Sequence, residues 1–233
     1  MSTEALTAAS IPWERRDELG YAAALLQTVR LFAFSPVEAF TRLNPDCGLS
    51  GPLRFGVIVG SIGILLNILG AAIFGSVALF DLPPEIREVF EFTVAGRSLE
   101  WVPLLIALVT GSLVGMLVTL VVFPPIFVLL LFLWSAVLHG FLRVVGGIKH
   151  SEAGFKATFA VAAYSSLAFL AHLVPMVGDL VATLWVIALH TVGLAIVHRT
   201  SRMRAFLATA LLPLGLLSLL VVVVLLAQSS SAS

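Results

Sequence analysis

Of the 233 residues in this chain, 60% are hydrophobic and only 11% are charged, which is too apolar for an ordinary soluble domain. The formal net charge of zero excludes attraction to nucleic acid through bulk charge, so no nucleic-acid partner is expected. Cys47 is the only cysteine, which excludes an internal disulfide and a metal cage made of cysteines alone. The composition predicts an integral membrane protein.

Residues 1–53 are expected to form a cytoplasmic N-terminal region with interfacial helices. The apolar stretch 21–34 is too short and too interrupted to span a bilayer that needs ~20 apolar residues. It is better suited to an interfacial helix, with Trp13 at headgroup depth. Pro36 can open a second short helix at its first position.

A first span is predicted from about Phe55 to Phe80. Small or polar residues recur along it at helical steps of four and three, namely Gly56, Gly60, Gly63, Asn67 and Gly70. This spacing predicts a helix-packing face, because small residues let another backbone approach closely. The alternative is that Asn67 lines a polar cavity, since polar groups within a membrane are often functional.

The apolar tract 101–145 would reach about twice the ~30 Å hydrocarbon thickness as a straight helix. Pro124 and Pro125 are expected to break it, leaving a main span over about 126–145. The preceding part, 104–123, is expected to be re-entrant or strongly tilted. It holds a small-xxx-small packing site at Gly111 and Gly115. A plain two-span hairpin is the alternative.

Two antiparallel spans are predicted next, over 155–175 and 180–197, joined by a turn at Met176–Gly178 with Asp179 as the N-cap. In such a hairpin Tyr164 would lie level with His190. With their neighbours they form an expected intramembrane polar cluster of Tyr164, Ser165, His190 and Thr191. The cluster is either an interhelical hydrogen bond that sets the register or a proton relay or substrate contact.

A last span is expected over about 205–227, followed by a disordered tail at 229–233. Three basic residues precede this span and are expected to face lipid headgroups: Arg199, Arg202 and Arg204.

Positive charge decides the number of crossings. Five spans leave only Arg87 and Arg97, of thirteen Lys and Arg residues, on the side opposite the N-terminus. Six spans, with 101–145 as a hairpin, would put most of the cations outside. Because positive charge favours the cytoplasm, we expect an all-α bundle of five spans within residues 54–228. Its N-terminus would be cytoplasmic and its C-terminus outside.

Catalytic signals are absent from the sequence patterns. The five histidines do not make the His-Glu-x-x-His spacing of a zinc site, and no Gly-x-Ser-x-Gly elbow or phosphate-binding Gly-rich loop occurs. No catalytic residue, cofactor or metal is therefore predicted, and the chain is expected not to be an enzyme.

Several short segments resemble one known family. They are Gly48-Leu-Ser-Gly-Pro-Leu, Phe141-Leu-Arg-Val-Val-Gly-Gly, Gly154-Phe-Lys-Ala-Thr, Ala163-Tyr-Ser-Ser and Val174-Pro-Met-Val-Gly. In this order they resemble the Yip1 domain family in its bacterial form. The positions that carry the family motif are Gly51, Pro52, Gly146, Gly147, Pro175 and Gly178. The resemblance implies a five-span bundle in the bacterial cytoplasmic membrane with a cytoplasmic N-terminus.

The resemblance also bears on partners. Eukaryotic relatives work in vesicle traffic and contact prenylated small GTPases. The entry motif of those relatives begins with an acid that the segment at Gly48 lacks, so GTPase docking is doubtful here. We expect a non-enzymatic membrane scaffold with membrane lipids as partners, and a homo- or hetero-oligomer through its helices. The alternative is a small permease or channel component with a polar path past Asn67, Tyr164 and His190.

Overall fold

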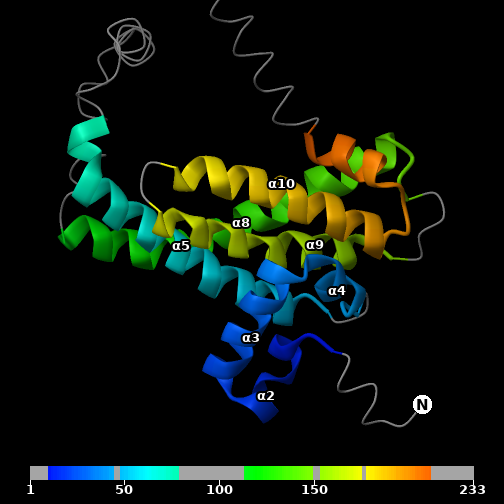
Figure 1. The fold of residues 1–233 in the computed structure, drawn as a ribbon, viewed down its shortest axis with the longest axis horizontal. Coiled ribbons are helices and arrows are strands. Elements are labelled where there is room, and N and C mark those ends of the chain that lie inside the picture. The colour runs from blue at the N-terminus through cyan, green and yellow to red at the C-terminus, as the bar shows by residue number, and fades with distance from the viewer. Residues whose placement is uncertain (1–9, 45–47, 79–112, 149–152, 175–176, 211–233) are drawn as a thin grey trace, which may run out of the picture. The chain divides into compact units, whose positions relative to one another are not determined.

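The computed structural model describes residues 10–44, 48–78, 113–148, 153–174 and 177–210. Over these residues the chain is helical with no strand, which confirms the all-α fold class (Figure 1). The chain divides into two compact units. Unit 1 comprises Met1–Phe55, Leu130–Ser165 and Trp185–Ser233, and unit 2 comprises Gly56–Leu129 and Ser166–Leu184.

Unit 1 begins with four short helices: η1 (Pro12–Arg15), α2 (Arg16–Leu19), α3 (Tyr21–Phe34) and α4 (Pro36–Thr41). Pro36 does open α4, and Gly20 separates α2 from α3 with a φ of 80° that favours glycine. Trp13 is only 1% exposed and therefore packs inside the protein, while its depth relative to the lipid headgroups stays a prediction. Its backbone N–H donates to the Thr28 hydroxyl at 2.8 Å, and its indole N–H donates to the Gly51 carbonyl at 2.8 Å.

The long helix α5 runs from Ser50 to Ala78 and begins five residues before the predicted span. Gly51 and Pro52 lie in its first turn, where proline has no hydrogen bond to lose. Of this helix, residues 50–55 belong to unit 1 and the rest to unit 2.

The predicted break at Pro124 and Pro125 is wrong, because both prolines lie inside one helix, α8 (Leu113–Val144). In a membrane, breaking the helix would leave more backbone N–H and C=O groups unpaired than the prolines themselves do. Neighbouring helices can satisfy the few groups that proline leaves without a partner. A helix of 32 residues reaches about 48 Å, so it must tilt or extend beyond a ~30 Å hydrocarbon layer. The alternative hairpin involves residues 101–112, which lie outside the described part of the chain.

The third predicted span is wound in two ways, as α9 (Phe155–Ser165) and then as the 3-10 helix η2 (Ser166–Leu173). The fourth is α10 (Gly178–Val197), close to its predicted bounds. Asp179 lies in the first turn of α10. A further helix starts at residue 202 and is described as far as 210, and the Ser201 hydroxyl accepts the Arg204 backbone N–H at 3.3 Å at its start.

Within the described residues, three helical stretches are long and apolar enough to cross a membrane: Ser50–Gly70, Leu117–Val144 and Gly178–Val197. The α-helix α9 has 11 residues and falls short of this length by itself. The later part of the fifth expected span, 211–227, lies outside the described residues. The number five therefore stays a prediction.

Candidate functional site

A chain of hydrogen bonds in unit 1 joins two histidines through a buried threonine. Thr158 of α9 is 0% exposed, and its Oγ1 lies 2.9 Å from His139 Nδ1 of α8 and 2.8 Å from His198 Nε2. The two imidazole centroids are 5.9 Å apart. One hydroxyl thus holds together α8, α9 and the end of α10.

The direction of these hydrogen bonds follows from the second partner of His198. The imidazole of His198 also hydrogen-bonds the Ala153 carbonyl, which can only accept. Because Nε2 lies 2.8 Å from Thr158 Oγ1, we infer that Nδ1 carries the proton and that Nε2 accepts from the Thr158 hydroxyl. The hydroxyl has given away its only proton, so it accepts from the Nδ1–H of His139. The proton order is His139 to Thr158 to His198.

His198 is neutral near pH 7 in this arrangement. Burial is the largest cause that lowers the pKa of His198, the nearby His139 adds to this effect, and the resulting pKa is about 4. The Ala153 carbonyl acts in the opposite direction. The chain therefore works as a structural clasp with a fixed proton arrangement.

The end of α8 is fixed by a Schellman motif at Gly146 and Gly147. The Gly147 N–H donates to the Leu142 carbonyl at 2.7 Å, and the Gly146 N–H donates to the Arg143 carbonyl at 3.0 Å. Gly146 has a φ of 70°, and a Cβ on Gly147 would lie 2.5 Å from the Leu142 side chain. The left-handed φ therefore favours glycine at Gly146, and a side chain at Gly147 would require Leu142 to shift.

The same motif ends α10, next to His198. The Thr200 N–H donates to the Ala195 carbonyl at 3.0 Å, and the Arg199 N–H donates to the Ile196 carbonyl at 3.2 Å. Here the left-handed position is occupied by Arg199, with a φ of 49°. The predicted lipid-facing residues Arg199, Arg202 and Arg204 are all exposed, and Arg204 Nη1 also donates to the Gly146 carbonyl at 3.4 Å.

The residues of the expected intramembrane polar cluster, Tyr164, Ser165, His190 and Thr191, all belong to unit 1. Tyr164 is stacked on Phe32 at 4.9 Å and packs against Phe55 at 5.0 Å, whereas the ring near His190 is Trp134 at 6.1 Å. The pairing of Tyr164 with His190 stays a prediction.

Glu14 is a residue that the sequence did not single out. Its Oε1 is buried, and its carboxyl hydrogen-bonds the Tyr164 hydroxyl. Burial is the largest effect and raises the pKa of Glu14, the Tyr164 hydroxyl and the Arg16 guanidinium oppose it, and the resulting pKa is about 7. A half-buried carboxyl thus titrates near neutral pH beside Tyr164. No local pattern signals this contact, because the two residues are far apart in sequence.

Unit 2 brings together most of the predicted packing face of α5. A Cβ on Gly60 would lie 2.8 Å from the Phe127 ring, and one on Gly63 would lie 2.5 Å from the Phe169 Cβ. The Gly56 carbonyl accepts from the Ser166 hydroxyl at 3.5 Å, whereas at Gly70 no described atom lies within 4 Å of such a Cβ. Gly115 lies in α8, and Gly111 lies outside the described residues.

Asn67 is joined to the start of α10 in unit 2. Its amide Nδ2 donates to Asp179 Oδ1 at 3.3 Å, and the same oxygen lies 3.0 Å from His172 Nε2. Gly178 permits this arrangement, because a Cβ there would lie 2.7 Å from the Ala171 carbonyl oxygen. The family position Pro175 lies outside the described residues.

All Lys and Arg residues in the described part of the chain belong to unit 1. They are Arg15, Arg16, Arg30, Arg42, Arg54, Arg143, Lys156, Arg199, Arg202 and Arg204. The described residues of unit 2 carry Asp179 and no cation. Over the same described ranges, no three His, Cys, Asp or Glu side chains could hold a metal ion.

Comparison with known families decides the membership of this chain. Its residues 29–225 match the model of the Yip1 domain family. The chain belongs to the Yip1 domain family. No curated protein and no solved structure matches it. The Yip1 domain thus includes the close-packed glycines Gly60, Gly63 and Gly147, the Thr158 clasp and the three described helices that are long enough to span a membrane. It leaves out Glu14 and Trp13, which precede it.

Proposed function

We propose that this Yip1 domain protein is a non-enzymatic scaffold of the bacterial cytoplasmic membrane, which organises lipid or protein partners. The observation that supports the proposal is that polar side chains hydrogen-bond one another between helices. His139, Thr158 and His198 bond one another, and Asn67 bonds Asp179. Polar groups that pair between helices of one chain stabilise a fixed bundle. Few polar groups are then free to bind a substrate on its way through the membrane.

We further propose five spans with a cytoplasmic N-terminus. Ten cations in unit 1 support this orientation, because cytoplasmic ends of spans are rich in Lys and Arg. The start of α5 and the end of α8 both belong to unit 1, which fits two spans that run in opposite directions.

The single native cysteine offers a test of this topology. Cys47 should react with a membrane-impermeant maleimide in inverted vesicles and stay unreacted in right-side-out vesicles. In a Cys47→Ser background, Ala232→Cys should show the opposite pattern. Labelling of both positions from the same side contradicts an odd number of spans.

A specific observation favours a permease or channel component as the second candidate. His190 Nδ1, Ser165 Oγ and Thr191 Oγ1 are buried without hydrogen-bond partners in the described part of the chain. Buried polar atoms normally have hydrogen-bond partners, and water molecules in a path through the membrane would provide them here.

Cysteine accessibility separates the two candidates. In the Cys47→Ser background, Ser165→Cys and Thr191→Cys should resist a small water-soluble thiol reagent if the centre is dry and packed, as the scaffold requires. Exposed Ser201→Cys serves as the reactive control and buried Leu189→Cys as the unreactive one. Rapid labelling of both test positions would overturn the scaffold in favour of the permease.

A further inference from the structure

A cavity of about 530 Å³ lies within unit 1, beside the C-terminal half of α3 and the end of α4. Its polar lining comes from Gln27, Arg30, Ser35 and Arg42, and Leu31 and Phe34 form an apolar wall. This volume is in the range of small-ligand sites. The lining combines two cations with apolar surface and contains no carboxylate.

The two guanidinium groups are available to an anion. Arg30 is exposed and pairs with no carboxylate of the described chain. Arg42 pairs with Glu38, one turn earlier in α4, and both side chains are substantially exposed. Exposed pairs of this spacing contribute little to stability, so a better acceptor can compete for the arginine.

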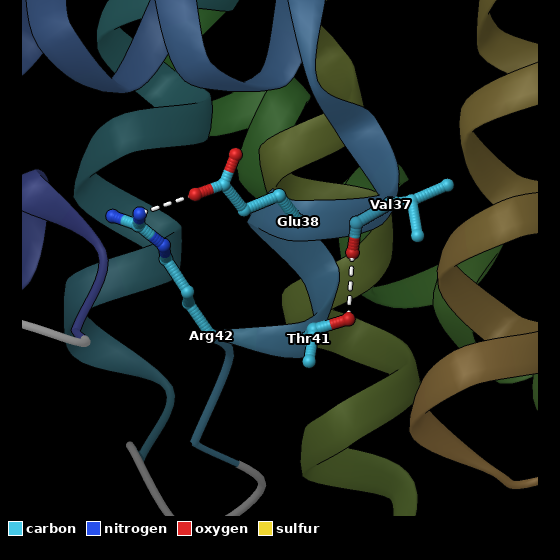
Figure 2. A network of polar contacts seen from close by, with 4 residues as sticks. All are labelled: Val37, Glu38, Thr41 and Arg42. Carbon is cyan, nitrogen blue, oxygen red and sulfur yellow. Dashed lines mark hydrogen bonds and ion pairs between the residues drawn. The ribbon is translucent and has the colours of Figure 1, made fainter.

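Figure 2 shows how α4 presents Arg42. Glu38 engages one side of the guanidinium, while the Thr41 hydroxyl donates to the Val37 carbonyl at 2.8 Å within the same helix. The hydroxyl therefore does not compete for Arg42. A guanidinium has five N–H donors, so donors remain beyond those that Glu38 uses.

The apolar surface near this cavity indicates the depth at which it opens. Phe34, which lines the cavity, is 82% exposed, and Leu26 of the same helix is 68% exposed. Tyr21 and Val37 are exposed as well. Such side chains on a short helix of a membrane protein favour the boundary between headgroups and acyl chains.

We propose that this cavity, the Arg30–Arg42 cavity, binds the phosphate of an anionic phospholipid. Arginine recognises phosphate through paired N–H donors, and Leu31 and Phe34 would contact the acyl chains. Inorganic phosphate would use the cations and leave the apolar wall uncovered, which is why an amphiphile fits better. The inference rests on the proposed function in one respect, because this lipid would be a partner of the proposed scaffold.

Lipid binding to the full-length protein in detergent tests the proposal. Native mass spectrometry would follow titration with phosphatidylglycerol, phosphatidylcholine and, separately, inorganic phosphate. Arg30→Gln should weaken phosphatidylglycerol binding about fivefold to tenfold. The matched control Arg54→Gln removes the same charge from an exposed position outside the cavity and should leave binding within about twofold. Thermal unfolding checks that both variants fold.

Each other result overturns the proposal in a distinguishable way. Equal losses in Arg30→Gln and Arg54→Gln would mean general attraction to the basic surface. Inorganic phosphate that binds as well as phosphatidylglycerol, with no effect of Phe34→Gln, would mean a simple anion site. Unchanged binding in Arg30→Gln would mean that no site exists. None of these results affects the cysteine accessibility on which the proposed scaffold depends.

Discussion

Substitution of Thr158 by valine tests whether the hydroxyl clasps the helices together. Valine has nearly the same shape but cannot donate or accept, so both hydrogen bonds of the Thr158 hydroxyl, at 2.9 and 2.8 Å, are lost together. His139 Nδ1–H and His198 Nε2 would then lack partners in a buried site. Each orphaned group costs about 1–3 kcal/mol, and the half-exposed His139 recovers part of this through water.

We therefore expect Thr158→Val to lower the free energy of unfolding by about 2–4 kcal/mol. For a domain of this size that corresponds to a fall in Tm of roughly 4–16 °C. Thr158→Ser keeps the hydroxyl and loses one methyl group, which costs about 1 kcal/mol. Thermal unfolding in one detergent, followed by tryptophan fluorescence, measures the difference between the two variants.

A matched control comes from Thr209, which is also buried but whose hydroxyl donates only to the Ala205 carbonyl of its own helix at 3.0 Å. Thr209→Val should change stability by less than about 0.5 kcal/mol, because that carbonyl retains its helical partner. If Thr158→Val is as stable as Thr158→Ser, the clasp contributes nothing. If Thr209→Val is equally damaging, the loss reflects removal of any buried hydroxyl.

Three further predictions concern pH, backbone conformation and close packing. Glu14 has a pKa of about 7 in the folded chain against an ordinary 4.5, so its contribution to stability is present below about pH 4.5 and lost as pH rises through 7. Glu14→Gln should flatten the fall of Tm between pH 5 and 8, and an unchanged slope would contradict the burial of this carboxyl. Arg199→Gly should raise stability by about 1 kcal/mol in a Tm measurement, because it relieves the left-handed φ of 49°, and a lower Tm would contradict this. Gly63→Ala should destabilise by about 1–3 kcal/mol because its Cβ would meet Phe169, whereas Gly70→Ala has open space and should be neutral or stabilising, so equal Tm values for the two would refute the close contact.

The sequence was sufficient to predict those apolar helices whose signals are local or periodic. Hydropathy and turn signals located α10 to within two residues, and glycine spacing located a face of α5 whose Gly60 and Gly63 meet other helices closely. These features are local or periodic. The break at Pro124 and Pro125 failed because the cost of proline in a helix depends on what surrounds it.

The clasp and the buried carboxyl could not be predicted in the same way. Thr158 lies 19 residues from His139 and 40 from His198, and the three residues lie in, or directly after, different helices, so no helical period relates them. Glu14 stands in a charged run that is typical of a solvated surface. Its burial arises only when η1 folds back so that Trp13 reaches Thr28 and Gly51. Contacts of this kind depend on packing between elements that no single window of sequence contains.

Close packing at glycines and hydrogen bonds between side chains both hold the helices together, and the difference affects how each substitution should be interpreted. In unit 2, Gly60, Gly63 and Gly178 let a ring or a backbone approach to distances that any Cβ would prevent. In unit 1, hydroxyl, imidazole and indole groups join the helices, as at Thr158 and Trp13. Close packing is sensitive to added volume, whereas hydrogen-bonded contacts are sensitive to lost polarity. Added methyl groups should therefore be most damaging at close-packed glycines such as Gly63, and isosteric removal of polar atoms most damaging at hydrogen-bonded positions such as Thr158.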